Sequence, residues 1–227
     1  MIVFDDVTLR YHYDDFDLLK GASFMLVEGV NTVLADVQSG KSSVCKLLLK
    51  DVAPTRGRIT LDGQDVASIT NSNLDILYLP TNPAFFENRS VQYNIEYPLR
   101  VRTYSKLERK ERAMQIAKSL GVDNLDAKVK RLPPEKRRLV ALARGLTVKR
   151  KIVLFDDFFA FDDGLEARDE VLQRFEGATC VILTSDARLA TGNTVVLDGG
   201  VTVYQGDAET ARQTVGELGW LVDSIRS

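Results

Sequence analysis

An apolar strand that runs into a short loop and then into a helix constrains the fold of this chain more than any other feature. The strand covers residues 32–35, the loop ends in Gly40-Lys41-Ser42, and apolar residues recur at helical spacing over residues 44–48. This context and the Gly-Lys-Ser triplet match the second half of the phosphate-binding pattern G-x-x-x-x-G-K-[ST]. In such a loop, backbone N–H groups at a helix N-terminus hold phosphate oxygens. The sequence therefore predicts an α/β fold with a site for nucleotide phosphates.

The residues of this loop have expected roles. Lys41 is expected to bring positive charge to the β- and γ-phosphates, and the Ser42 hydroxyl is expected to ligate Mg²⁺. Ala35 stands where the pattern has its first glycine, and alanine is small enough if its φ stays negative. The alternative is a chance Gly-Lys-Ser after a strand. The predicted nucleotide-binding residues of the loop are Gln38, Ser39, Gly40, Lys41, Ser42 and Ser43.

A second strand ends in two acidic residues. Residues 152–155 are apolar, as in a parallel strand buried on both faces, and Asp156 and Asp157 follow directly. Ligands of open α/β sheets bind at the carboxyl ends of the strands. We therefore expect Asp156 to bind Mg²⁺, directly or through water, and Asp157 to polarise the attacking water. The alternative is two ordinary solvated acids at a strand end, but the phosphate loop upstream favours a nucleotide site.

The rest of the chain changes from β-rich to helical and back. Residues 2–9 are typical of a strand, and Asp62-Gly63 is typical of a hairpin turn. In the middle, Ser105-Lys106-Leu107-Glu108 is a capping box, and a further helix is predicted from about Pro134. We place a helical insert at roughly 82–148.

The composition is that of an ordinary globular domain. The chain has 227 residues, of which 44% are apolar and 27% charged, and its formal net charge is −2. We interpret residues 1–227 as a single domain and expect no nucleic-acid partner, because the basic stretch over residues 128–151 is typical of solvated helix faces. Cys45 and Cys180 are far apart in the sequence and are expected to be free, buried thiols.

Neither a secretory leader nor a membrane-spanning segment is predicted. The first six residues lack both basic charge and a long apolar stretch. No apolar run approaches the ~20 residues that cross a bilayer. We expect a cytoplasmic protein whose membrane part, if its process needs one, is supplied by another chain.

The order and spacing of these motifs resemble the ABC ATPase family over nearly the whole chain. Leu77-Tyr78-Leu79-Pro80-Thr81 looks like the segment that ends in the Q-loop. Residues 90–100 look like the start of the helical subdomain, and residues 140–146 like the helix after the signature motif. The resemblance implies an α/β P-loop NTPase (ABC ATPase) fold with an antiparallel β subdomain and a helical subdomain. It also implies ATP and Mg²⁺ as cofactors.

The same resemblance assigns further residues. Tyr11 falls at the position of the aromatic that stacks on adenine, and Asp163 falls on the D-loop aspartate. Thr81 stands at the Q-loop glutamine, from where it is expected to reach Mg²⁺ through water, and Ser185 stands at the switch histidine. Asp157 replaces a glutamate, which withdraws the catalytic carboxylate by about one methylene. A misplacement of about 1 Å can cost on the order of a hundredfold in rate.

The signature motif of the family is replaced here. Leu132-Pro133-Pro134-Glu135-Lys136 stands where the family has Leu-Ser-Gly-Gly-Gln, whose amides and serine hydroxyl contact the γ-phosphate bound to the opposite subunit. Proline has no N–H to donate, and Glu135 brings a negative charge towards a negative ligand. At a helix N-terminus the same residues favour the helix itself. The segment is therefore typical of local helix stability rather than of phosphate contact.

The resemblance implies an ATP-binding subunit of an ABC transporter or related membrane complex, which binds Mg-ATP with weak or partner-dependent hydrolysis. Its implied partners are a transmembrane permease subunit and a second ABC ATPase, in a homodimer or a heterodimer, at the inner face of the cell membrane. The alternative is a pseudo-ATPase that acts as an ATP-gated or structural interaction module. The aromatic stretches over residues 84–86 and 158–161 are core residues or, for the first, a groove where the family meets its permease.

Overall fold

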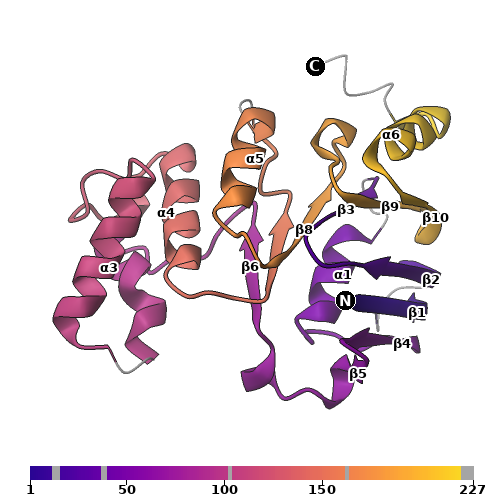
Figure 1. The fold of residues 1–227 in the computed structure, drawn as a ribbon, viewed down its shortest axis with the longest axis horizontal. Helices are drawn as coiled ribbons and strands as arrows, with labels where there is room; N and C mark the ends of the chain where they lie inside the picture. The colour runs from indigo at the N-terminus through magenta and orange to yellow at the C-terminus, as the bar shows by residue number, and fades with distance from the viewer. Residues whose placement is uncertain (12–15, 37–39, 102–103, 162–163, 221–227) are drawn as a thin grey trace. The chain divides into compact units, whose positions relative to one another are not determined.

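The structure is a computed structural model that divides into two units (Figure 1). We call Met1–Tyr78 with Lys151–Ser227 the sheet unit and Leu79–Arg150 the helical unit. The range 82–148, expected to be a helical insert, falls inside the helical unit. Each unit has a hydrophobic core of its own. The residues that the structure describes are 1–11, 16–36, 40–101, 104–161 and 164–220.

One sheet of the sheet unit is antiparallel. Its order is β2-β1-β4-β5, with β1 at Ile2–Leu9, β2 at Leu19–Leu26, β4 at Arg56–Leu61 and β5 at Gln64–Asp65. Successive side chains of β1 and β2 largely alternate between buried, apolar positions and more exposed ones, as expected of a sheet with one face on the core. The predicted turn at Asp62-Gly63 is confirmed, because both residues have positive φ, 51° and 82°, and join β4 to β5.

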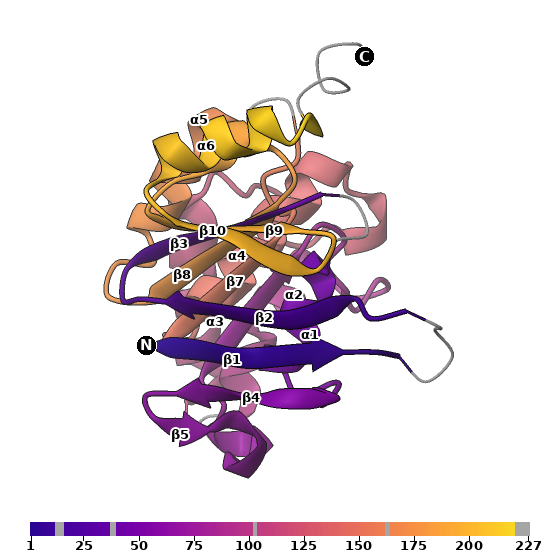
Figure 2. The ribbon, with the colours of Figure 1, turned by 90° about the vertical axis from the view of Figure 1, so that its right-hand side faces the viewer.

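The other sheet is mostly parallel. Its order is β10-β9-β3-β8-β7-β6, with β3 at Val30–Ala35, β6 at Ile76–Pro80, β7 at Ile152–Asp156, β8 at Thr179–Thr184, β9 at Asn193–Asp198 and β10 at Val201–Gly206. β3 pairs in parallel with β8 and β9, and β7 with β8, whereas β10 returns antiparallel to β9 (Figure 2). Every residue of β7 is buried, which confirms the predicted strand covered on both faces.

The α-helices among the described residues of the sheet unit are α1 at Lys41–Leu48, α5 at Gly164–Gln173 and α6 at Ala208–Glu217. The apolar side of α1, with Val44 and Leu47, joins one core cluster with residues of both sheets. α6 packs on β9 and β10, as Figure 2 shows. Cys45 and Cys180 are buried and form no disulfide, as expected. Because α1 is enclosed by the core, its first residues, Lys41 and Ser42, are held in a fixed place after Gly40.

The aromatic stretch after β7 belongs to this core. Phe158 and Phe159 are almost fully buried, and their rings lie 5.8 Å and 5.1 Å from that of Phe155, measured between centroids. Phe175 adds an edge contact to Phe155 at 5.7 Å. Core packing therefore accounts for Phe158 and Phe159, and the ring cluster anchors the end of β7 where the two acids follow.

The helical unit contains α2 at Val91–Glu96, α3 at Lys106–Ser119 and α4 at Pro134–Leu146, which pack against one another. The capping box is confirmed, because Ser105 and Glu108 each accept from the backbone N–H of the other. α4 starts at Pro134, as predicted, with proline in its first turn. Within the described ranges, no helix combines the length and the apolar character needed to cross a bilayer.

Candidate nucleotide-binding site

The phosphate loop turns into α1 at Gly40. The φ of Gly40 is 93°, in the left-handed region that side chains disfavour. A Cβ atom at this position would lie 2.8 Å from Leu19 Cδ2, the end of a flexible side chain, and 3.2 Å from the carbonyl oxygen of Leu18, so the left-handed φ is the main reason for glycine. The carbonyl oxygen of Gly40 accepts the first N–H bonds of the helix. Lys41 and Ser42 therefore occupy the first turn of α1, at its positive end.

β7 carries the two predicted acids to the edge of the sheet where α1 begins. Asp156 is 8% exposed. Asp157 follows with a φ of 46°, a left-handed conformation that aspartate adopts more readily than most residues. The ammonium of Lys41 lies 3.1 Å from Asp157 Oδ2 and 3.2 Å from Oδ1. The structure thus brings Lys41 of the phosphate loop to the acidic end of β7.

A tyrosine from the neighbouring strand contacts the first of these acids. The hydroxyl of Tyr78 on β6 donates to Asp156 Oδ2 at 2.7 Å. Burial raises the pKa of Asp156, while this hydrogen bond opposes the rise. Burial, with the hydrogen bond to Asp156, raises the pKa of the Tyr78 phenol. The Tyr78 phenol therefore keeps its proton at neutral pH and donates it in the hydrogen bond to Asp156.

Tyr11, predicted to stack on adenine, lies half-buried beside α1. Its hydroxyl oxygen is 3.5 Å from Ser43 Oγ, and Lys46 Nζ is 5.0 Å from the centre of its ring. Ser43 is 5% exposed and lies on the inner side of α1, whereas Ser42 is exposed. Of the two serines, Ser42 presents its hydroxyl where a bound ion can reach it.

A cavity of about 570 Å³ lies beside Asp157. Its lining includes both residues predicted to act on the attacking water, Asp157 and Ser185. Asp186 and Arg188 line it too and form a two-pronged ion pair, with Nε 2.9 Å from Oδ1 and Nη2 2.7 Å from Oδ2. These residues follow the carboxyl ends of β7 and β8, the edge where ligands of parallel sheets bind.

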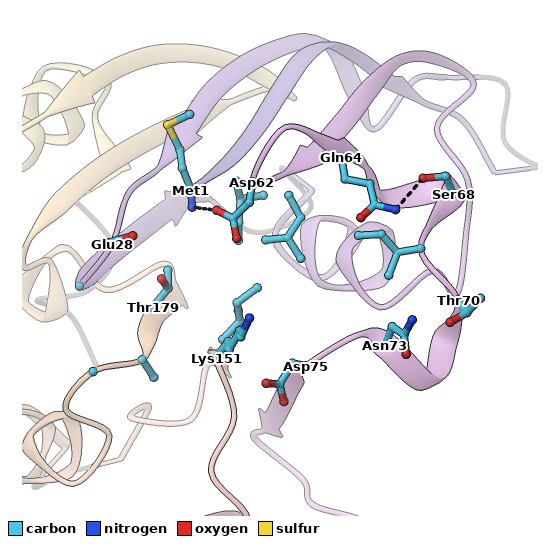
Figure 3. Close-up of a pocket in the computed structure, with 17 residues that line it drawn as sticks. Met1, Glu28, Asp62, Gln64, Ser68, Thr70, Asn73, Asp75, Lys151 and Thr179 are labelled. Atoms are coloured by element: carbon cyan, nitrogen blue, oxygen red, sulfur yellow. Dashed lines mark hydrogen bonds and ion pairs between the residues drawn. The ribbon is translucent and has the colours of Figure 1, made fainter.

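A larger cavity, of about 790 Å³, lies at the opposite edge of the parallel sheet, where β7 and β8 begin. The start of β1, from the antiparallel sheet, also lines it. Figure 3 shows that polar groups around it already bond to one another. The Met1 amino group donates to Asp62 at 2.6 Å, and Gln64 donates to Ser68 at 3.3 Å. Size favours this cavity, but topology favours the carboxyl edge. We place the candidate site at the carboxyl edge because Asp157, which lines the smaller cavity, also contacts Lys41 at the start of α1.

Other predicted residues lie elsewhere in the chain. Thr81 follows β6 and lies in the helical unit. The segment over residues 132–136, which replaces the signature motif, lies in the same unit. In that segment Pro133 precedes α4 without a side-chain cap, and Glu135 is the acidic residue of the first turn. Three residues discussed from the sequence lie outside the described residues: Gln38, Ser39 and Asp163.

The donor set suits a magnesium nucleotide. Mg²⁺ is usually held by one or two carboxylates and completes its shell with water and phosphate oxygens. Asp156 offers a carboxylate, and Ser42 offers an exposed hydroxyl. Lys41 adds an ammonium, and the N-terminus of α1 adds a positive dipole end. The residues present therefore fit the phosphate end of Mg-ATP.

Two features of this site have no local signal in the sequence. Tyr78 was notable only as part of a segment that resembles the Q-loop, yet it meets Asp156 across 78 positions of sequence. The two residues meet because β6 and β7 are neighbours in the sheet. The Asp186–Arg188 pair lies two residues apart after β8, a spacing that is common on any surface. The Tyr78–Asp156 contact therefore depends on how the strands are ordered, whereas the Asp186–Arg188 pair is local.

A phosphate loop between a parallel strand and a helix, facing an acidic strand end, is the arrangement that defines P-loop nucleotide-binding proteins. Residues 19–160 match the family model described as ABC transporter. The chain belongs to this family.

Curated relatives agree with this assignment. The chain is 32% identical over 146 residues to the molybdate/tungstate import ATP-binding protein WtpC of Pyrococcus horikoshii, a match that covers 64% of this chain and 40% of that protein. It is 28% identical over 216 residues to the Fe(3+) ions import ATP-binding protein FbpC of Mannheimia succiniciproducens, covering 90% of this chain and 60% of that protein. The chain thus spans between 40% and 60% of the length of these relatives.

The fold is also that of a solved family structure. A bacterial Atm1-family ABC exporter with ATP bound superposes with a TM-score of 0.83, at 23% sequence identity. The match covers 100% of this chain and 42% of that one. At this identity the likeness establishes the fold, which is the predicted ABC ATPase fold.

Proposed function

We propose that this chain is the ATP-binding subunit of an ABC transporter and that it binds Mg-ATP at the carboxyl edge of its parallel sheet. The observation that carries the proposal is the meeting of Lys41 and Asp157 at 3.1 Å, beside the cavity that Ser185 also lines. The relatives named above are ATP-binding proteins of import systems, which favours import over export.

Each site residue has a role in this proposal. Residues 40–43 hold the phosphates through the start of α1, with the Lys41 ammonium at the β- and γ-phosphates. Ser42 and Asp156 would hold Mg²⁺, and the family resemblance proposes Thr81 as a further ligand through water. When bound, Mg²⁺ would supply positive charge that stabilises the phosphate groups. Tyr11 stacks on the adenine, and Gln38 and Ser39 complete the phosphate loop.

The catalytic residues of the proposal are Asp157 and Ser185, which act on the attacking water. The Asp157 N–H donates to the carbonyl oxygen of Leu183 at 2.9 Å, so the backbone that carries this carboxylate is tied to β8. Its side chain is shorter than glutamate by about one methylene, and Ser185 lacks the imidazole of a histidine. We therefore propose weak hydrolysis that depends on a partner.

A transmembrane permease subunit is the proposed partner of the helical unit. Phe86 and Tyr97 are 42% and 41% exposed, and their rings lie 4.5 Å apart. Tyr93 meets Phe86 edge-on, with 5.5 Å between ring centroids, and the Arg100 guanidinium lies 4.2 Å from the Tyr93 ring centre. Exposed aromatic rings flanked by arginine are typical of protein-interaction anchors. Phe85, by contrast, packs against the core of the unit.

A dimer completes the proposal. In the family, the segment at residues 132–136 faces the nucleotide of the opposite subunit, either a second copy or another ABC ATPase. Pro133 and Pro134 leave that segment with fewer N–H donors, so each composite site has an altered half. Such a dimer is expected to bind nucleotide but to hydrolyse it slowly.

Calorimetric titration of the purified chain with ATP and Mg²⁺ tests the proposed function. We expect one nucleotide per chain with a dissociation constant in the micromolar range. AMP, which lacks the β- and γ-phosphates that Lys41 holds, serves as the matched control and is expected to bind far more weakly. No heat of binding at millimolar ATP would contradict the proposal.

Restoring the two catalytic positions is expected to raise ATP turnover. The double variant Asp157→Glu with Ser185→His returns the longer carboxylate and the imidazole, and we expect at least about a tenfold gain in phosphate release. Glutamate at a φ of 46° costs about 1 kcal/mol of stability, so the melting temperature is measured in parallel. An unchanged rate in a folded double variant would place the limit in the segment at residues 132–136.

A further inference from the structure

We infer that Tyr78 is a positioning residue for the metal: its hydroxyl orients the Asp156 carboxylate towards Mg²⁺. The inference rests on the proposed function and adds to it a residue of a neighbouring strand. The donor–acceptor distance from Tyr78 to Asp156 Oδ2 is 2.7 Å, the usual length of a well-formed O–H···O hydrogen bond.

The Asp156 carboxylate is nearly enclosed, with 8% of the residue exposed, so the protein groups around it, rather than bulk water, set its orientation. The bond from Tyr78 engages Oδ2 and constrains the plane of the carboxylate. Groups that orient a metal ligand in this way commonly change metal affinity when they are removed.

The Tyr78 ring is itself held in place. It is half-buried and packs against the core cluster of the sheet unit, and β6 lies beside β7 in the sheet. Backbone pairing and ring packing therefore fix the position of the hydroxyl independently of the bond to Asp156. A hydroxyl oxygen fixed in this manner sets the orientation of the neighbouring carboxylate instead of adapting to it.

Tyr78→Phe tests this role because it removes one oxygen and keeps the ring. The probe is ATP, titrated once with Mg²⁺ and once with EDTA, and the quantity compared is the ratio of the two dissociation constants. Tyr204→Phe is the matched control: the Tyr204 hydroxyl also donates to a carboxylate, Asp207, at 3.1 Å, but on β10. Both variants are first checked by thermal melting.

We expect Tyr78→Phe to lower the gain in ATP affinity that Mg²⁺ provides by about tenfold, with little change in EDTA. Tyr204→Phe is expected to keep the wild-type ratio. A wild-type ratio in Tyr78→Phe overturns the inference alone, whereas a wild-type protein that binds no ATP overturns the proposed function with it. Equal weakening with Mg²⁺ and with EDTA assigns Tyr78 a structural role and also overturns the inference.

A double-mutant cycle separates an effect through Asp156 from a general loss of packing. In an Asp156→Ala background the carboxylate that Tyr78 orients is gone, so Tyr78→Phe is expected to leave the Mg²⁺ ratio unchanged. A further drop in that ratio would mean that Tyr78 acts on the metal by another route, and it would overturn the assignment.

Discussion

Lys41→Ala is expected to weaken Mg-ATP binding by about a hundredfold, because a charge-assisted contact to phosphate contributes about 1.5–3 kcal/mol. The substitution has a second consequence. The Lys41 ammonium now balances the Asp157 carboxylate at 3.1 Å, and its side chain is only 11% exposed. Without it, Asp157 and Asp156 together present uncompensated negative charge to an anionic ligand. Isothermal titration with ATP and Mg²⁺ measures the loss.

A second variant separates the two effects of Lys41. Lys41→Ala combined with Asp157→Asn removes one charge of each sign and leaves the local net charge as in the wild type. If the ammonium contacts phosphate directly, this double variant stays weak, within about tenfold of the single variant. Lys110→Ala, which removes an exposed charge from α3, controls for net charge and is expected to bind normally. Normal affinity in Lys41→Ala would disprove the phosphate-loop assignment.

Gly57→Ala is expected to destabilise the sheet unit by at least about 3 kcal/mol, the upper end of the cost of local backbone strain. The φ of Gly57 is 78°, and a Cβ atom there would lie 2.2 Å from the carbonyl oxygen of Asp6 and 2.5 Å from that of Asp5. Asp6 itself has a φ of 50°, where the register between β1 and β4 shifts. Two backbone segments would have to separate, so the free energy of unfolding in urea is expected to fall.

Gly63→Ala is the matched control for this effect. Gly63 has a φ of 82°, close to that of Gly57, but a Cβ atom there meets nothing within 4 Å. Its substitution is expected to cost only the price of the left-handed backbone, about 1–2 kcal/mol. The difference between the two variants measures the clash with β1. Equal losses of unfolding free energy in the two variants would show that the clash at Gly57 adds nothing to the cost of the left-handed backbone.

The elements that the sequence predicted well are those with local signals. The hairpin turn at Asp62-Gly63, the capping box at Ser105 and the proline start of α4 at Pro134 are all present. Each depends on hydrogen bonds or φ values within a few residues, so residue type alone is informative. The buried run of β7 was equally clear, because a strand covered on both faces has no polar alternation.

The candidate site was predictable in its parts and not in its contacts. The Gly40-Lys41-Ser42 triplet and the acids at residues 156–157 follow from motif and context. Their meeting does not, since Lys41 and Asp157 are 116 positions apart. Nor does the sequence show that Asp157 adopts a left-handed backbone, which depends on its bond to β8. The aromatic stretch over residues 84–86 was open between core and partner groove, and the structure divides it: Phe85 packs on the core of the helical unit, whereas Phe86 is 42% exposed.

The sequence by itself determined the family resemblance, the strand and helix pattern, and the residue types available for a phosphate and magnesium site. Only the tertiary structure decided which side chains share an edge: Lys41 with Asp157, and Tyr78 with Asp156. The physical reason lies in the parallel sheet. Parallel strands cannot be joined by a tight turn, so residues at the carboxyl ends of nearby strands are distant in sequence. Their contacts are set by strand order, which local propensity does not encode.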